Sequence, residues 1–245
     1  MKKYMFLSTV FLFSCFLVMS QENKNSYFPM LGENAPSFIG ESTTGTINFP
    51  EDYKGSWTIL FSHPADFTPV CSTELLELAA LQDDFNKIGV KLVVLSTDAI
   101  SSHVQWVSSI ETIRYKNREP VKIKFPLLAD ENLEISKKYG MIQPDSDSRK
   151  DVRGVFIIDP SNKIRAIIYY PMTIGRNFDE IKRAVIALQT ADSNNVLIPA
   201  NWNPGDDVLV RLIKGEYNDN TLKPNDKDVS QLIWYMTFKK LKPMF

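Results

Sequence analysis

The sequence predicts an α/β protein with a central β-sheet and helices on both of its faces. Two apolar runs rich in β-branched or aromatic residues, at 57–61 and 90–96, are typical of buried strands. A long amphipathic stretch separates them, and two further strand-like runs follow near 152–170 with a turn between them. Strands that alternate with helices in this way form layered α/β folds.

The first unit is a strand, a loop and a helix. Trp57 to Phe61 is the strand, and the stretch from Pro64 to Pro69 is the loop. The helix is predicted from Pro69 to Ile88, since proline is tolerated at the first helical position. The helix is amphipathic, with helical spacing between Leu75, Leu78, Ala79, Gln82 and Phe85. The run Val90 to Ser96 is the next buried strand.

The remaining elements continue the pattern and end in a strand pair and a helix. We expect a helix at Ser101–Ile110, a strand at Ile123–Leu128 interrupted by Pro126, a helix at Asn132–Tyr139 ended by Gly140, strands at Val152–Ile158 and Ile164–Tyr170 joined by the turn 159–163, and a helix at Phe178–Leu188. This order, βαβ followed by ββα, is that of a thioredoxin-like fold with elaborations.

The chain divides into three parts by composition. We assign residues 1–20 to a signal peptide, 21–191 to the thioredoxin-like domain and 192–245 to a C-terminal extension. Within the extension only Val208–Ile213 and Leu232–Phe238 resemble strands. Because it has too little apolar surface to fold alone, we expect it to dock on the main domain or on a second subunit.

The amino terminus has the pattern of a secretory signal. Lys2 and Lys3 precede an apolar run from Tyr4 to Met19, which is too short and wrongly flanked for a membrane span. We therefore expect an exported protein, periplasmic or extracellular. A lipid anchor on Cys15 is the alternative, although the apolar run continues past that residue.

Charge excludes one class of partner. The chain has 28 basic and 29 acidic residues and a net charge of −1, so it has no electrostatic footprint for nucleic acid.

Cys71 is the one cysteine that remains after signal removal. Thr68 is the natural N-cap of the helix that begins at Pro69, which places Cys71 in the first turn. There the positive end of the helix dipole favours the reactive thiolate. Most lone cysteines are buried and inert, but the spacing of Pro64, Thr68, Pro69 and Cys71 favours a nucleophile.

The segment from Ser62 to Cys71 (SHPADFTPVC) resembles the active-site segment of the one-cysteine peroxiredoxins, thiol-dependent peroxidases of the AhpC/TSA type. Further similar segments are Gly32–Phe38, Asp98 with His103 and Trp106, Val152–Pro160, Tyr170–Pro171, Gly175–Glu180 and Pro199–Trp202. The resemblance covers the mature chain up to about Val210.

The resemblance implies a peroxidase without metal or cofactor. The thiolate of Cys71 attacks hydrogen peroxide or an alkyl hydroperoxide and becomes a sulfenic acid, which an external thiol reduces. It implies that the Thr68 hydroxyl and the Val70 and Cys71 N–H groups hold the peroxide. Arg153 would stabilise thiolate and transition state, and Pro64 would shield the thiolate from water.

The resemblance also implies supporting residues and an assembly. Glu74 and Arg176 would orient Arg153, and His63 would hydrogen-bond near the sulfur. We expect a homodimer or a higher homo-oligomer.

Two departures from the family pattern bear on function. No second cysteine occurs between Gly205 and Phe245, so no resolving disulfide can form within the extension. Some one-cysteine relatives are described as phospholipases with a Gly-x-Ser-x-Gly site. Here Ser56 is flanked by Lys54 and Thr58 at the glycine positions, and Pro50 and Ser161 stand where His and Asp are needed, so the sequence does not support a lipase.

Other functions remain open at this point. A peroxide sensor would use the same sulfenic acid to oxidise a partner protein, and sequence does not separate it from an enzyme. A disulfide exchanger would need a Cys-x-x-Cys pair, which the chain lacks. A chaperone or structural protein would consume no peroxide.

Overall fold

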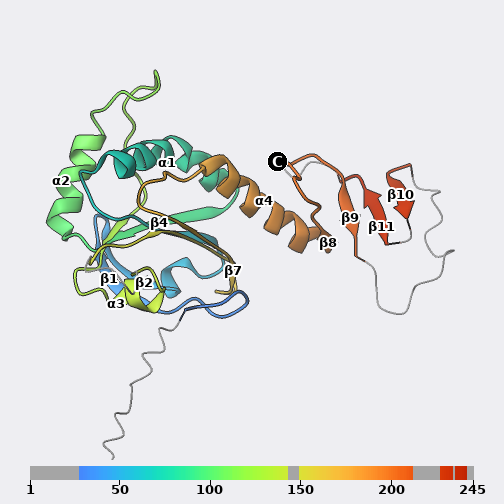
Figure 1. Cartoon of the computed structure of the whole chain (residues 1–245), viewed down its shortest axis with the longest axis horizontal. Coiled ribbons are helices and arrows are strands. Elements are labelled where there is room, and N and C mark those ends of the chain that lie inside the picture. The colour runs from blue at the N-terminus through green and yellow to red at the C-terminus, as the bar shows by residue number, and fades with distance from the viewer. Residues whose placement is uncertain (1–27, 143–148, 212–226, 234, 242–245) are drawn as a thin grey trace, which may run out of the picture.

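The computed structural model describes residues 28–142, 149–211, 227–233 and 235–241, and it confirms the α/β fold class (Figure 1). Its centre is a seven-stranded sheet with the order β2-β1-β5-β4-β3-β6-β7. The strands are β1 (Phe38–Ser42), β2 (Gly45–Phe49), β3 (Trp57–Ser62), β4 (Val90–Ser96), β5 (Leu127–Ala129), β6 (Arg153–Ile158) and β7 (Ile164–Tyr170).

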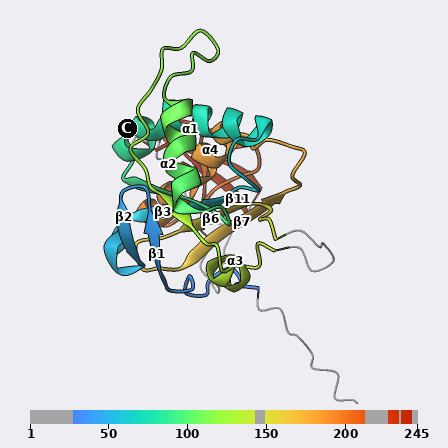
Figure 2. The same cartoon turned by 90° about the vertical axis from the view of Figure 1, so that its left-hand side faces the viewer.

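The helices α1 (Pro69–Lys87), α2 (Ile100–Ile110), α3 (Glu134–Lys138) and α4 (Phe178–Asn194) cover both faces of this sheet, as predicted (Figure 2). Ile59 and Phe61 of β3 face α1, α2 and α4, whereas Leu60 faces α3 and β1. All three side chains are buried, as expected for a strand covered on both sides.

Pairing around β3 brings distant segments to one end of the sheet. β3 runs parallel to β4 and antiparallel to β6. The carboxyl end of β3 therefore lies beside the amino end of β6, where Phe61 pairs with Val155. Helix α1 begins seven residues after β3 ends, so its first turn lies at this same edge.

Several boundaries differ from prediction. The hairpin of β1 and β2 was not predicted, because Gly40, Gly45 and alternating polar residues weaken its strand pattern. Strand β5 is limited to three residues after Pro126. The short helix begins at Glu134 rather than Asn132. The Asp130 carboxylate accepts from two backbone N–H groups in its first turn. The last helix continues past Leu188, through Asn194.

The C-terminal extension forms a second sheet that lies beyond the end of α4 (Figure 1). Its order is β10-β11-β9-β8, with β8 (Val196–Leu197), β9 (Val208–Val210), β10 (Val229–Ile233) and β11 (Met236–Lys239). Val196, Trp202 and Val208 pack on Ile186 and Ala187 of α4, which confirms docking on the main domain.

The second strand predicted in the extension, Leu232–Phe238, is wrong, because this stretch belongs to two antiparallel strands. The first, Val208–Ile213, is a strand only to Val210, and Leu212 and Ile213 lie outside the described residues. The predicted signal segment, residues 1–20, also lies outside them. No helix in the described part of the chain is long and apolar enough to cross a membrane.

Gly154 is required by a close contact between β6 and β3. The Ser62 hydroxyl donates to the Val152 carbonyl at 2.7 Å and accepts from the Gly154 N–H at 2.9 Å. A Cβ atom at residue 154 would lie 2.9 Å from this hydroxyl oxygen, closer than real Cβ contacts. Since two hydrogen bonds hold the hydroxyl, it has no free direction in which to move.

We predict that Gly154→Ala lowers the free energy of unfolding by about 1–3 kcal/mol, the usual cost of overpacking. Urea denaturation of wild type and variant measures this. If the clash with Ser62 is the cause, Gly154→Ala should cost less in a Ser62→Ala background than in the wild type. Equal costs in both backgrounds would assign the loss to something other than this contact.

Asp151, just before β6, is a fully buried carboxyl group with 0 % exposure. Burial raises the pKa of Asp151 well above its usual value of 3.8, and the like charges of Asp130 and Asp98 add to the shift, while the Ser136 hydroxyl opposes it. The native state therefore binds a proton that the unfolded state releases near pH 3.8.

We predict that the free energy of unfolding falls as the pH rises from 3.8 toward the folded-state pKa of Asp151, because the native state keeps a proton that the unfolded state releases. Asp151→Asn cannot ionise, so its stability relative to wild type should increase over that range and be constant below it. Denaturation curves at a series of pH values measure the difference. A difference that does not change with pH would mean that Asp151 is not protonated in the native state.

Candidate active site

Cys71 lies in the first turn of α1, at the carboxyl end of β3, as predicted. Its side chain is only 1 % exposed. Phe67, just before the helix, has a positive φ of 53°. This left-handed residue turns the chain so that Pro69 can begin the helix, at a cost of about 1–3 kcal/mol in backbone strain.

Thr68 occupies the N-cap position with extended φ and ψ of −104° and 147°, but its side chain does not cap the helix. The hydroxyl donates instead to the Ala65 carbonyl at 2.9 Å. The prediction of a capping side chain is therefore wrong, although the position is correct. Because the hydroxyl proton is used by Ala65, the oxygen remains available as an acceptor.

Arg153 contacts the sulfur directly. Its Nη1 donates to Cys71 Sγ at 3.2 Å and to Glu74 Oε2 at 2.7 Å. Its Nε and Nη2 donate to the Met172 carbonyl at 3.1 and 2.7 Å. The guanidinium is thus fixed from two sides, with one nitrogen aimed at the thiol.

Glu74 is the common partner of two arginines. Besides Arg153, it accepts from Arg176 through Nε at 2.9 Å, Nη2 at 2.7 Å and the backbone N–H at 2.8 Å. Arg176 Nη1 also donates to the carbonyls of Ser62 and Gly154, each at 2.9 Å. The predicted grouping of Glu74 and Arg176 with Arg153 is therefore present.

His63 borders the inner side of the cysteine. Its ring lies 5.1 Å from the Trp106 ring, and a cavity of about 10 Å³ is lined by both His63 and Cys71. Such a volume holds about one water-sized atom. Burial, together with the positive charges of His103, Arg176 and Arg153, lowers the pKa of His63 well below its usual value, and the Ala65 backbone opposes the shift. His63 is therefore neutral at physiological pH.

Pro64 is buried in the loop between β3 and α1, next to His63. Its role as a shield against water stays a prediction, as do the catalytic roles assigned to the other residues.

Sequence reasoning assigned no role to three contributors to the site. One is the Met172 carbonyl, for which a backbone acceptor leaves no signal in the sequence. The others are Asp66 and His103, which form a buried pair behind His63, with His103 Nδ1 at 2.8 Å from Asp66 Oδ2. His63 and His103 are the two histidines of the chain, and this scarcity could have indicated that they belong to one site.

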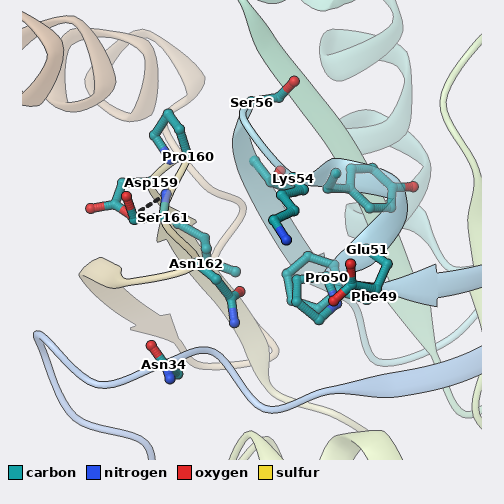
Figure 3. Close-up of a pocket in the computed structure, with 13 residues that line it drawn as sticks. Asn34, Phe49, Pro50, Glu51, Lys54, Ser56, Asp159, Pro160, Ser161 and Asn162 are labelled. Carbon is teal, nitrogen blue, oxygen red and sulfur yellow. Dashed lines mark hydrogen bonds between the residues drawn. The ribbon is translucent and has the colours of Figure 1, made fainter.

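A separate pocket of about 250 Å³ lies at the opposite end of β3 (Figure 3). It brings Ser56, Pro50 and Ser161 together, the positions considered for a lipase. No histidine lines it, and the Ser56 hydroxyl points away from the other two (Figure 3). The Asp159 carboxylate is used by the Ser161 N–H, the Lys163 N–H and Arg165. A serine hydrolase triad cannot be assembled from these residues.

Within the described ranges, no three histidine, cysteine or carboxylate side chains are arranged to hold a metal ion.

Comparison with known proteins agrees with this geometry. The model of the AhpC/TSA family matches residues 31–167, and that of the C-terminal domain of 1-Cys peroxiredoxin matches residues 187–211. A peroxiredoxin of Methanosarcina mazei is 46 % identical over 214 residues, which cover 86 % of this chain and 98 % of the relative.

Two solved structures resemble the chain over most of its length. A yeast mitochondrial 1-Cys peroxiredoxin is 38 % identical with a TM-score of 0.75, covering 86 % of this chain and 99 % of the other. A cysteine-to-serine variant of peroxiredoxin 6 from Arenicola marina is 36 % identical with a TM-score of 0.75, covering 86 % and 97 %. With Cys71 at the start of α1 and Arg153 against its sulfur, the chain belongs to the peroxiredoxins of the AhpC/TSA family, which are peroxidases, and it is of the one-cysteine type.

Proposed function

We propose that this peroxidase reduces hydrogen peroxide and organic hydroperoxides through Cys71 alone, and that an external thiol returns Cys71 to its reduced state. The contact that carries the proposal is the 3.2 Å approach of Arg153 Nη1 to the Cys71 sulfur. A buried guanidinium stabilises a thiolate and the negative charge that develops during O–O cleavage.

The first half of the reaction is a nucleophilic displacement at oxygen. The Cys71 thiolate attacks the terminal oxygen of ROOH, the S–O bond forms and the O–O bond breaks. The products are Cys71–SOH and an alkoxide RO⁻, which takes a proton from water to become ROH. The sulfur is oxidised by two electrons and the peroxide is reduced by two.

The groups around Cys71 have complementary parts in this step. The Thr68 oxygen can accept a hydrogen bond from the peroxide O–H, since its own proton is donated to Ala65. The N–H groups of Val70 and Cys71 lie in the first turn of a helix without a side-chain cap, so they can donate to peroxide oxygen. Arg153 supplies the positive charge that stabilises the thiolate and the oxygen that leaves.

The second half of the reaction needs a thiol from outside the site. Cys71 is the one free cysteine among the described residues. The yeast mitochondrial 1-Cys peroxiredoxin has a thiol resolving mechanism that operates via glutathione/thioredoxin systems. We propose a reductant of this chemical class, a small thiol or a dithiol protein, for the present chain.

Export and dimer formation are further parts of the proposal. Lys2 and Lys3 before an apolar run support cleavage of a signal near Ser20 and a periplasmic or extracellular location. Strand β7 is an edge of the main sheet, and Tyr169, Met172 and Ile174 near it are exposed apolar side chains. An exposed apolar edge of this kind is typical of a surface that pairs with a second subunit.

We predict that one equivalent of peroxide adds a single oxygen to the mature protein, and that dimedone traps it. Excess peroxide should then give sulfinic acid, since no second thiol intercepts the sulfenic acid. Mass spectrometry measures both products. Cys71→Ser should remove them together with peroxide consumption supported by dithiothreitol. Remaining turnover in Cys71→Ser, or a reducible covalent dimer of the wild type, would contradict this mechanism.

We predict that Arg153→Met slows Cys71 oxidation for two separable reasons. The variant loses a charge that favours the thiolate and also a donor for the developing oxygen charge. After correction for the thiolate fraction, the stopped-flow rate constant of Arg153→Met should therefore remain at least roughly a hundredfold below that of the wild type. A loss of this size is usual when a transition-state donor is removed. The ultraviolet absorbance of the thiolate gives that fraction. If the correction removes the whole defect, Arg153 acts on ionisation alone.

A further inference from the structure

The buried pair of His103 and Asp66 has a proton arrangement that its contacts determine. His103 Nε2 faces the Leu128 carbonyl at 3.2 Å, and Nδ1 faces Asp66 Oδ2 at 2.8 Å. A carbonyl can only accept, so Nε2 must carry a proton. The contact between Nδ1 and Oδ2 then holds one further proton. Whether that proton lies on His103 or on Oδ2, the second oxygen of Asp66, Oδ1, remains an acceptor.

That second oxygen faces His63. Asp66 Oδ1 lies 3.7 Å from His63 Nε2, and the two side chains are 2 % and 3 % exposed. Asp66 Oδ1 and both ring nitrogens of His63 are buried without a partner in hydrogen-bonding geometry. Buried polar groups cost free energy when they are left unpaired. A shift of under about 1 Å would bring Oδ1 and Nε2 to a normal hydrogen-bond distance.

We propose that Asp66 and His103 are positioning residues that act through His63. The pair holds the proton of neutral His63 on Nε2, which leaves Nδ1 as an acceptor on a ring that lines the same cavity as Cys71. Neither Asp66 nor His103 lines the cavity that His63 shares with Cys71, so neither acts on the sulfur directly.

The consequence concerns the oxidised cysteine and rests on the proposed function. The shared cavity of about 10 Å³ has room for one oxygen atom, and Cys71–SOH presents an O–H donor. Glu74 and Arg176 also line the cavity, but they are hydrogen-bonded to each other, so the unpaired His63 nitrogen is the open acceptor. An acceptor there stabilises the protonated sulfenic acid. The second oxidation proceeds through the sulfenate, Cys71–SO⁻, which attacks ROOH to give Cys71–SO₂⁻ and ROH. Asp66 and His103, acting through His63, should therefore slow the overoxidation of Cys71.

Nitrogen NMR of the reduced protein tests the proton arrangement. The chain has two histidines, so ¹⁵N-histidine labelling gives two rings, and His63→Leu assigns them. In the wild type we expect His63 protonated on Nε2 alone. Asp66→Ala should give His63 a mixture of tautomers. Asp66→Asn should keep Nε2–H, because its amide oxygen can still accept. His63 protonated on Nδ1 in the wild type, or unchanged by Asp66→Ala, would overturn the proposal.

Kinetics test whether the pair acts through His63. The quantity measured is the ratio of the second to the first oxidation rate of Cys71. We expect His63→Leu, Asp66→Ala and His103→Leu each to raise this ratio roughly three- to tenfold, the equivalent of one lost hydrogen bond. In a His63→Leu background, Asp66→Ala should raise it no further. Val104→Ala, an exposed position on α2, is the matched control and should leave it unchanged.

The outcomes separate this inference from the proposed function. Additive effects of Asp66→Ala and His63→Leu would show that Asp66 does not act through His63, and would overturn the proposal. If Asp66→Ala does not fold, the wild-type NMR spectrum and Asp66→Asn still decide the proton arrangement. A wild type whose Cys71 shows no first oxidation would contradict the proposed function, while the tautomer of His63 would be measured independently.

Discussion

The active site depends on a buried cluster of charges in which one carboxylate, Glu74, is shared by two arginines. The side chains of Arg153, Arg176 and Glu74 are only 3–4 % exposed, so water screens their charges little. Two positive charges and one negative leave an excess of one positive charge against the Cys71 sulfur. The Cys71 thiolate balances this excess, whereas the neutral thiol leaves it uncompensated. The proposed reaction therefore uses the form of Cys71 that balances the charge of this cluster.

The same cluster joins parts of the chain that are far apart in sequence. Arg176, just before α4, donates to carbonyls of β3 and β6, while Glu74 extends from α1. These contacts hold the first turn of α1 against the sheet, where the sulfur meets Arg153. The Ser62 hydroxyl fixes the same end of β6 through the backbone on either side of Arg153. Fold stability and placement of the nucleophile therefore rest on the same hydrogen bonds.

The sequence predicted those elements whose local pattern and burial agree. Helix α1 and strands β4, β6 and β7 have continuous apolar faces, and their predicted boundaries differ from the structure by at most one residue. The β1–β2 hairpin was missed because its burial comes from packing on distant residues rather than from local pattern. In the site, side chains from a recognisable segment were identified, whereas the Met172 carbonyl was not. Thr68 shows a further limit, since its position indicated a cap but tertiary contacts direct its hydroxyl to Ala65.

Cys71 lies between two different environments, and the proposed chemistry uses both. Toward the helix start, Arg153 and backbone N–H groups are donors, which suit the thiolate and the departing alkoxide. On the inner side, a cavity of about 10 Å³ is lined by neutral His63, by apolar side chains, and by Glu74 and Arg176, whose charged groups are paired with each other. A donor there would stabilise the sulfenate and so assist its further oxidation, whereas a neutral acceptor favours the sulfenic acid. Burial first, and the neighbouring cations after it, lower the pKa of His63 and keep it uncharged. In the proposed mechanism, the arginines that favour the thiolate would therefore also help to maintain the acceptor for its product.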